Sequence, residues 1–211
     1  MKTYPKEFVD ILLTLTKNLC GLLDLFDCKY VMSGGTLLGS VRDQAFIPFD
    51  YDTDFDLLPG PTNRANFFTM VRYIQRSPEK FLMRVVPKLP VVMKFSPVTT
   101  YGFYKAAGFD RDHTPNPTCD VFFMQGGDEG DFTLVGNCWP KWTYKLGELH
   151  PITKRMFSGM MLNSACKPEG ILERYYGCDY MTPQFQEWPD CSGNAESRKK
   201  AQTRFEDPDT L

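Results

Sequence analysis

Residues 33–58 read SGGTLLGSVRDQAFIPFDYDTDFDLL, and this stretch decides the fold. It holds a Gly34-Gly35 pair and, further along, an aspartate at every second position from Asp50 to Asp56. Polar and apolar residues alternate with period two from Asp50 to Leu57, which predicts a β-strand ended by the following Pro-Gly-Pro. Residues two apart on a strand share a face, so the four carboxylates are expected on one face, in water or sharing cations.

The residues before the acidic strand predict a strand, a glycine turn and a helix. CKYVMS (28–33) has a strand pattern, and TLLGSVR (36–42) predicts a helix that Thr36 can cap. Glycines after a strand let backbone N–H groups approach phosphate oxygens, and the N-terminus of the next helix favours negative charge. The glycine turn is therefore a candidate phosphate site.

The rest of the chain predicts further helices and short strands. Apolar residues at helical spacing predict an amphipathic helix over residues 5–26 and another over 62–76. Short apolar runs in 81–96 and 99–109 predict strands, CDVFFM (119–124) predicts a strand that carries Asp120, and residues from Pro168 predict a short helix. We expect a single domain over residues 1–190 and a polar tail over 191–211.

Composition excludes several classes of protein. A formal net charge of -2 gives no basic surface for nucleic acid, so no nucleic-acid partner is expected. No apolar run is long enough for a transmembrane segment in this chain. The chain is expected to be cytoplasmic if it is complete, and in the Golgi or secretory lumen if a membrane anchor has been removed. Seven cysteines without a CxxC pair, with only two histidines, argue against a structural zinc site and leave the redox state open.

The acidic run from Asp50 to Asp56 has several alternative explanations. An EF-hand register from Asp50 or Asp52 lacks the required glycine and glutamate, and Ser40-Val41 stands where a P-loop needs Lys and Ser or Thr. A charged edge strand remains possible on the run alone, as does a D-x-D glycosyltransferase, although few residues precede the motif. The combination of S-G-G, a helix, a D-x-D strand and a later strand aspartate favours a polymerase-β-like nucleotidyltransferase. The predicted fold class is therefore α+β, with a mixed β-sheet flanked by helices.

The same residues resemble a known family. GGTLLGSVRDQAFIPFDYDTDFDLL resembles the LicD/fukutin signature, CDVFFM resembles its later aspartate strand, and HPITKRMFSGMMLNSACKPEGILERYYGCDYMTP resembles its closing segment. The resemblance spans about residues 29 to 183. It implies an enzyme that transfers a phospho-alcohol group, of the phosphocholine or ribitol-phosphate type, from a CDP-linked alcohol donor to a glycan acceptor hydroxyl. CMP would be released with the help of Mg²⁺ or Mn²⁺. A non-catalytic relative that acts as a binding or scaffold protein is the alternative.

Site residues follow from the matched motifs. When the sequence is aligned with the family signature without a gap, the catalytic and metal-binding carboxylates are Asp52, Asp54 and Asp120. When the alignment is shifted by one dipeptide, the metal pair becomes Asp54 and Asp56 instead. Asp50 is then expected near the site without binding metal directly. The expected phosphate-binding residues are Ser33, Gly34, Gly35, Thr36 and Arg42. No role in the site is expected for Lys94, Lys105, His113 or His150, and Arg42 could equally pair with Asp43.

Overall fold

The computed structural model of the chain describes residues 4–78, 83–89, 92–97, 117–126, 132–134 and 143–183. The expected strands within 99–109, the loop that carries His113, Lys105, and the polar tail over 191–211 lie outside the described residues. The single-domain prediction for residues 1–190 therefore stays a prediction.

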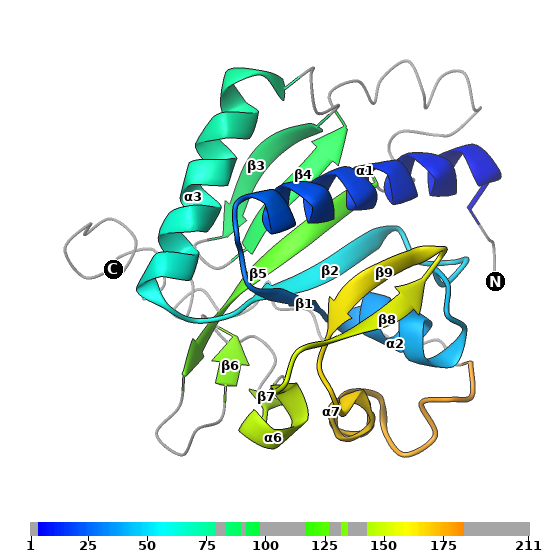
Figure 1. The fold of residues 1–211 in the computed structure, drawn as a ribbon. Coiled ribbons are helices and arrows are strands. Elements are labelled where there is room, and N and C mark those ends of the chain that lie inside the picture. The colour runs from blue at the N-terminus through cyan, green and yellow to red at the C-terminus, as the bar shows by residue number, and fades with distance from the viewer. Residues whose placement is uncertain are drawn as a thin grey trace.

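A mixed sheet is the centre of the structure (Figure 1). Its main strands lie in the order β1-β2-β5-β4-β3, and only β2 and β5 run parallel to each other among the described pairs. β6 extends from β5 and pairs with β7. The strands are β1 (Tyr30–Met32), β2 (Asp52–Leu57), β3 (Met83–Leu89), β4 (Val92–Pro97), β5 (Thr118–Gly126), β6 (Phe132–Leu134) and β7 (Thr143–Tyr144). The predicted α+β class with a mixed sheet is confirmed.

Two helices pack on the same face of the sheet, α1 (Lys6–Leu25) and α3 (Pro61–Arg76). Figure 1 shows α1 crossing the strands of the main sheet. Its buried residues recur every three or four positions, as the sequence pattern predicts. On α3, the Phe67 ring packs edge-on against Phe95 of β4 and Phe123 of β5. Phe95 pairs with Cys119, whose thiol contacts α1, so both helices cover one apolar face.

The opposite face carries the acidic residues, because side chains alternate along β2 and β5. Around this face lie α2 (Gly34–Arg42), α6 (Leu146–Leu149) and α7 (Pro168–Tyr176). A second sheet, the hairpin of β8 (Thr153–Phe157) and β9 (Met160–Ser164), packs beside β1 (Figure 1). None of the helices in the described part of the chain combines the length and the apolar character needed to cross a bilayer.

Two local predictions need correction. The glycines do not form a turn before the helix: α2 starts at Gly34, and Ser33 is its N-cap residue. Thr36 lies inside the first turn of α2 and is not its N-cap residue, and its hydroxyl oxygen accepts a hydrogen bond from the Asp54 amide of β2. The acidic strand starts at Asp52, because the Asp50 carboxylate accepts a hydrogen bond from the Tyr51 amide, a local bond that competes with sheet pairing.

Candidate active site

Three aspartates come together at the centre of the acidic face. Asp54 of β2 and Asp120 of β5 are paired residues of the parallel ladder, and Asp52 precedes Asp54 on the same face. One carboxylate oxygen from each of the three residues lies within 4.8 Å of the other two. Asp52 and Asp54 are partly exposed, whereas Asp120 is buried, at 4% exposure. Such a cluster of carboxylate oxygens is the donor set that Mg²⁺ and Mn²⁺ prefer.

The start of α2 is held directly against β2. The Ser33 amide donates to the Asp54 carbonyl at 3.0 Å, and the Asp54 amide donates to Thr36 Oγ1 at 2.8 Å. Gly34 has a φ of +50°, and a Cβ built there would overlap Asp54 Oδ2 and lie 3.1 Å from its Cγ. A Cβ on Gly35 would overlap the Asp50 carboxylate in the same way. Gly34 is therefore favoured by its backbone conformation as well as by the close approach of Asp54, whereas a larger residue at Gly35 would require the Asp50 carboxylate to move.

The carboxylates destabilise each other's charges. Burial raises the pKa of Asp54 well above its usual range, and the charges of Asp120, Asp50 and Asp56 raise it further. Burial also raises the pKa of Asp52 strongly, with added contributions from Asp54 and Asp50. A cation placed among these groups would relieve both effects, so the site fits a divalent metal on its charge as well as on its ligands.

Lys94 provides a cation on one side of this cluster. Its Nζ makes an ion pair with Asp120 Oδ2 across the β4–β5 pairing. Burial raises the pKa of Asp120, and Lys94 lowers it. Asp120 Oδ1 is buried and has no hydrogen-bond partner among the residues that the structure describes. That oxygen is therefore free to bind a metal ion while Lys94 holds the other.

The predicted phosphate-binding residues divide into two groups. Ser33, Gly34, Gly35 and Thr36 lie at the N-terminus of α2, beside Asp54. The Ser33 hydroxyl is fully buried and has no hydrogen-bond partner in the part of the chain that the structure describes. Arg42, by contrast, donates from Nε and Nη2 to Asp43 Oδ2 at 2.9 and 2.8 Å. The structure thus brings the residues of the α2 N-terminus to the acidic cluster and gives Arg42 a carboxylate partner of its own.

Asp56 lies deeper than the other β2 aspartates. It is fully buried, and its Oδ2 accepts a hydrogen bond from the Tyr144 hydroxyl. Asp52 and Asp54 instead converge with Asp120. This geometry favours the register in which Asp52 and Asp54 form the metal pair, and it gives Asp56 a hydrogen-bonding role toward β7.

The charges of the acidic face act on three tyrosines that the sequence patterns did not single out. The charges of Asp54, Asp50 and Asp52 add to burial in raising the pKa of Tyr176, which ends α7. The carboxylates also raise the pKa of Tyr51 and, after burial, that of Tyr4. Tyr51 directly adjoins the D-x-D motif and could have been noted. Tyr4 and Tyr176 lie far from the D-x-D motif in the sequence, and no local pattern marks them.

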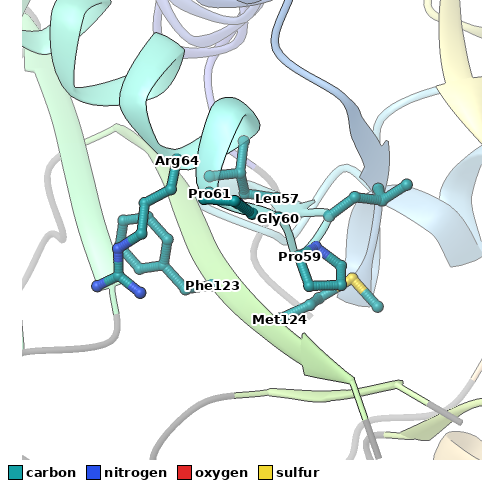
Figure 2. Close-up of a pocket in the computed structure, with 8 residues that line it drawn as sticks. Leu57, Pro59, Gly60, Pro61, Arg64, Phe123 and Met124 are labelled. Atoms are coloured by element: carbon teal, nitrogen blue, oxygen red, sulfur yellow. The ribbon is translucent and has the colours of Figure 1, made fainter. Parts of the chain in front are cut away.

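An apolar pocket of about 240 Å³ lies elsewhere, beyond the end of β2 (Figure 2). Arg64 lies over the ring of Phe123 there, 5.1 Å from its centroid, next to Met124 and the Pro59-Gly60-Pro61 segment. None of the three clustered aspartates lines this pocket. We therefore place the candidate chemistry on the acidic face and not in this pocket.

Comparisons with known proteins identify the family to which the chain belongs. The profile described as "LicD/FKTN/FKRP, nucleotidyltransferase domain" matches residues 27–167. A search of curated protein sequences returned no significant match. Among solved structures, the chain is similar to the lincosamide antibiotic adenylyltransferase LnuA with lincomycin bound, at 10% identity and a TM-score of 0.44, covering 85% of this chain and 98% of that one.

Two structures of the antibiotic-resistance factor ANT(2'')-Ia are also similar. The solution structure has 15% identity and a TM-score of 0.49, covering 92% of this chain and 84% of that one. The complex with adenylyl-2''-tobramycin has 14% identity and a TM-score of 0.46, covering 91% and 87%. The profile match and the observed sheet together confirm the predicted nucleotidyltransferase fold. Because the matched residues make up more than half of the sequence, the chain belongs to the LicD/FKTN/FKRP family.

Proposed function

We propose that the chain is a metal-dependent phosphotransferase that moves a phospho-alcohol group from a CDP-linked donor to a glycan hydroxyl and releases CMP. The transferred group is of the phosphocholine or ribitol-phosphate type. The family supports a transferase with a nucleotide-linked substrate. The observation that carries the proposal is the convergence of Asp52, Asp54 and Asp120 within 4.8 Å, directly beside the N-terminus of α2.

The acidic cluster would hold the metal. Asp52, Asp54 and Oδ1 of Asp120 would provide oxygen ligands, as Mg²⁺ or Mn²⁺ requires. When bound, the ion supplies positive charge that neutralises the donor diphosphate. The remaining catalytic work of the protein is to position the two reactants and to handle one proton.

The α2 N-terminus would hold the donor phosphates. The amides of its first turn have no partner inside the helix, and the helix dipole favours an anion there. The buried Ser33 hydroxyl, which has no hydrogen-bond partner within the described residues, can donate to a phosphate oxygen. Because Gly34 and Gly35 carry no Cβ, nothing separates this turn from the carboxylates.

The transfer step is an in-line displacement at the donor phosphorus. The oxygen of the acceptor hydroxyl forms the new P–O bond, the bond to the bridging oxygen of CMP breaks, and CMP leaves with that oxygen. The hydroxyl proton passes to a carboxylate of the cluster.

The test is CMP release from CDP-choline, CDP-ribitol and CDP-glycerol with Mg²⁺ or Mn²⁺ and candidate glycan acceptors. Asp54→Ala should abolish release, and Asp10→Ala, which removes an exposed aspartate of α1, should leave it unchanged. Full activity in Asp54→Ala would overturn the proposal. Binding of CDP donors without turnover would indicate a non-catalytic relative, and selection of UDP- or GDP-sugars would indicate a glycosyltransferase.

A further inference from the structure

A polar cluster lies directly behind the proposed metal site, on the helix-covered face of the sheet. Thr53 of β2 pairs with Cys119 of β5 in the parallel ladder, between the rung of Asp52 and that of Asp54 and Asp120. Because side chains alternate along a strand, Thr53 and Cys119 point away from the carboxylates. Both are fully buried beneath α1.

Thr16 of α1 completes this cluster. Its Oγ1 lies 3.0 Å from Thr53 Oγ1 and 3.4 Å from Cys119 Sγ, and Thr53 Oγ1 lies 3.0 Å from Cys119 Sγ. The three atoms thus form a closed triangle that joins a helix to two parallel strands. We call Thr16, Thr53 and Cys119 the back-face triad.

The hydrogen positions in the triad are constrained. Thr16 donates its own proton to the Leu12 carbonyl at 2.8 Å, so it can only accept from the strands. Two protons then remain for the triangle: Thr53 donates to Cys119 Sγ, and the Cys119 thiol can donate to Thr16 Oγ1. The Thr16–Thr53 side is a close polar contact without a proton of its own. Each member therefore depends on the others to satisfy a buried polar atom.

We propose that the back-face triad is a positioning group that fixes the lateral distance between β2 and β5, and through it the gap between Asp54 and Asp120. This inference rests on the proposed metal-dependent function. A rung with two buried hydrogen-bonding groups resists both slippage and widening of the strand pair, since either movement leaves a polar atom unsatisfied. Mg²⁺ needs its ligands at about 2.0–2.1 Å in near-ideal geometry, so a small widening would weaken its binding.

A purely structural role would predict something else. Loss of an ordinary core contact lowers the stability of the fold and leaves the affinity of a folded molecule for metal unchanged. Loss of a positioning contact changes the affinity of the folded molecule. Metal affinity measured well below the unfolding temperature therefore separates the two roles.

The chain offers matched variants for the test. Thr53→Val keeps the shape of the side chain and removes its hydroxyl, and Thr53→Ser restores the hydroxyl. Thr16→Val removes the contact with the strands together with its bond to Leu12. Thr14→Val is its control, because Thr14 makes the same type of bond, to the Asp10 carbonyl at 2.7 Å, on the exposed side of the same helix.

The experiment titrates Mn²⁺ into each purified variant, with free Mn²⁺ measured by electron paramagnetic resonance and folding checked by thermal unfolding. Thr53→Val and Thr16→Val should bind Mn²⁺ about tenfold more weakly, the lower end of the range for residues that orient metal ligands. Thr53→Ser and Thr14→Val should bind as the wild type does. If Thr53→Val fails to fold, the comparison of Thr16→Val with Thr14→Val decides the question.

The outcomes separate this inference from the proposed function. A wild type that does not bind Mn²⁺ would overturn the proposed metal site and the positioning role together. A wild type that binds Mn²⁺, with valine variants that bind equally well, would overturn the positioning role alone. Equal weakening in Thr14→Val and Thr16→Val would also overturn it, because the effect would then belong to the helix and not to the triad.

Discussion

Lys94 and Asp120 are opposite residues on the antiparallel strands β4 and β5, and the Lys94 ammonium is paired with Asp120 Oδ2. The pair sits at the edge of a cluster that otherwise contains only negative charge. The lysine thereby offsets part of the cost of burying the Asp120 carboxylate, and it pairs with only one of the two carboxylate oxygens. The protein thus carries part of the charge compensation that its carboxylates need before any metal binds.

Replacing Lys94 with methionine should make the fold depend more strongly on metal. The substitution leaves the buried Asp120 carboxylate without its cation, and because the Lys94 side chain is 26% exposed, we expect a loss of about 2 kcal/mol in chelator. Saturating Mg²⁺ should recover most of this loss, since it supplies the missing charge. Thermal unfolding with EDTA and with Mg²⁺ measures the difference. Lys94→Arg is the control, and an equal response to Mg²⁺ in all three proteins would contradict the expectation.

Adding one methyl group at Gly34 should damage the site more than the fold. Alanine must adopt a φ of +50° and place its Cβ against the Asp54 carboxylate. We expect a loss of about 1–2 kcal/mol from the backbone conformation alone. A displaced Asp54 should lower activity about 100-fold. CMP release and chemical denaturation measure the two effects.

Gly21 offers a matched control for that substitution. It lies within α1, and a Cβ built there meets nothing within 4 Å. Gly21→Ala should therefore stabilise the protein by about 0.5–1 kcal/mol, because glycine is a poor helix former. Its activity should be unchanged. Similar activity losses in Gly21→Ala and Gly34→Ala would show that the contact with Asp54 is not the cause.

The sequence predicted the elements that depend on local pattern. The spacing of apolar residues predicted residues 5–26 as a helix, which the structure places at Lys6–Leu25, and period-two alternation located β2 to within two residues. Contacts between residues far apart in the sequence could not be predicted from local patterns. The pairing of Tyr144 with Asp56 joins residues far apart in the sequence, and nothing near either one indicates the other.

The β8–β9 hairpin shows a signal that could have been used. Ser158 and Gly159 link paired Phe157 and Met160, and both have positive φ, at 47° and 80°. A Ser-Gly dipeptide between two strand-like runs indicates a two-residue hairpin. The back-face triad has no such signal. Thr16, Thr53 and Cys119 meet only once the parallel strands and α1 are placed.

Neutralising Asp54 should stabilise the metal-free protein at neutral pH. The folded-state pKa of Asp54 is raised, so the protonated form of this side chain favours the folded state. This contribution to stability is fully present below about pH 4, where Asp54 is also protonated in the unfolded chain. It is lost as the pH rises through the folded-state pKa of Asp54. Asp54→Asn removes this loss and should raise the melting temperature at pH 7 in EDTA. The gain should vanish near pH 4. Added Mg²⁺ should stabilise the wild type but not the variant, and a variant less stable than the wild type at pH 7 would contradict this account.

The two registers of the acidic strand predict opposite results for Asp52 and Asp56. Asp52 converges with Asp54 and Asp120, whereas Asp56 accepts a hydrogen bond from Tyr144 in the core. Asp52→Asn should therefore abolish Mn²⁺ binding, and because the pKa of Asp52 is raised as that of Asp54 is, it should not lower stability in chelator at pH 7. Tyr144→Phe leaves the buried Asp56 oxygen without this donor, and it should cost about 2 kcal/mol while Mn²⁺ affinity is retained.

Asp56→Asn completes the comparison, because an amide can still accept the tyrosine proton through its oxygen. It should bind Mn²⁺ like the wild type. Calorimetric titration of Mn²⁺ into the three variants, with denaturation in EDTA, measures both quantities. The register built on Asp54 and Asp56 would be correct instead if Asp56→Asn lost metal binding and Asp52→Asn kept it, because removal of a direct ligand abolishes binding.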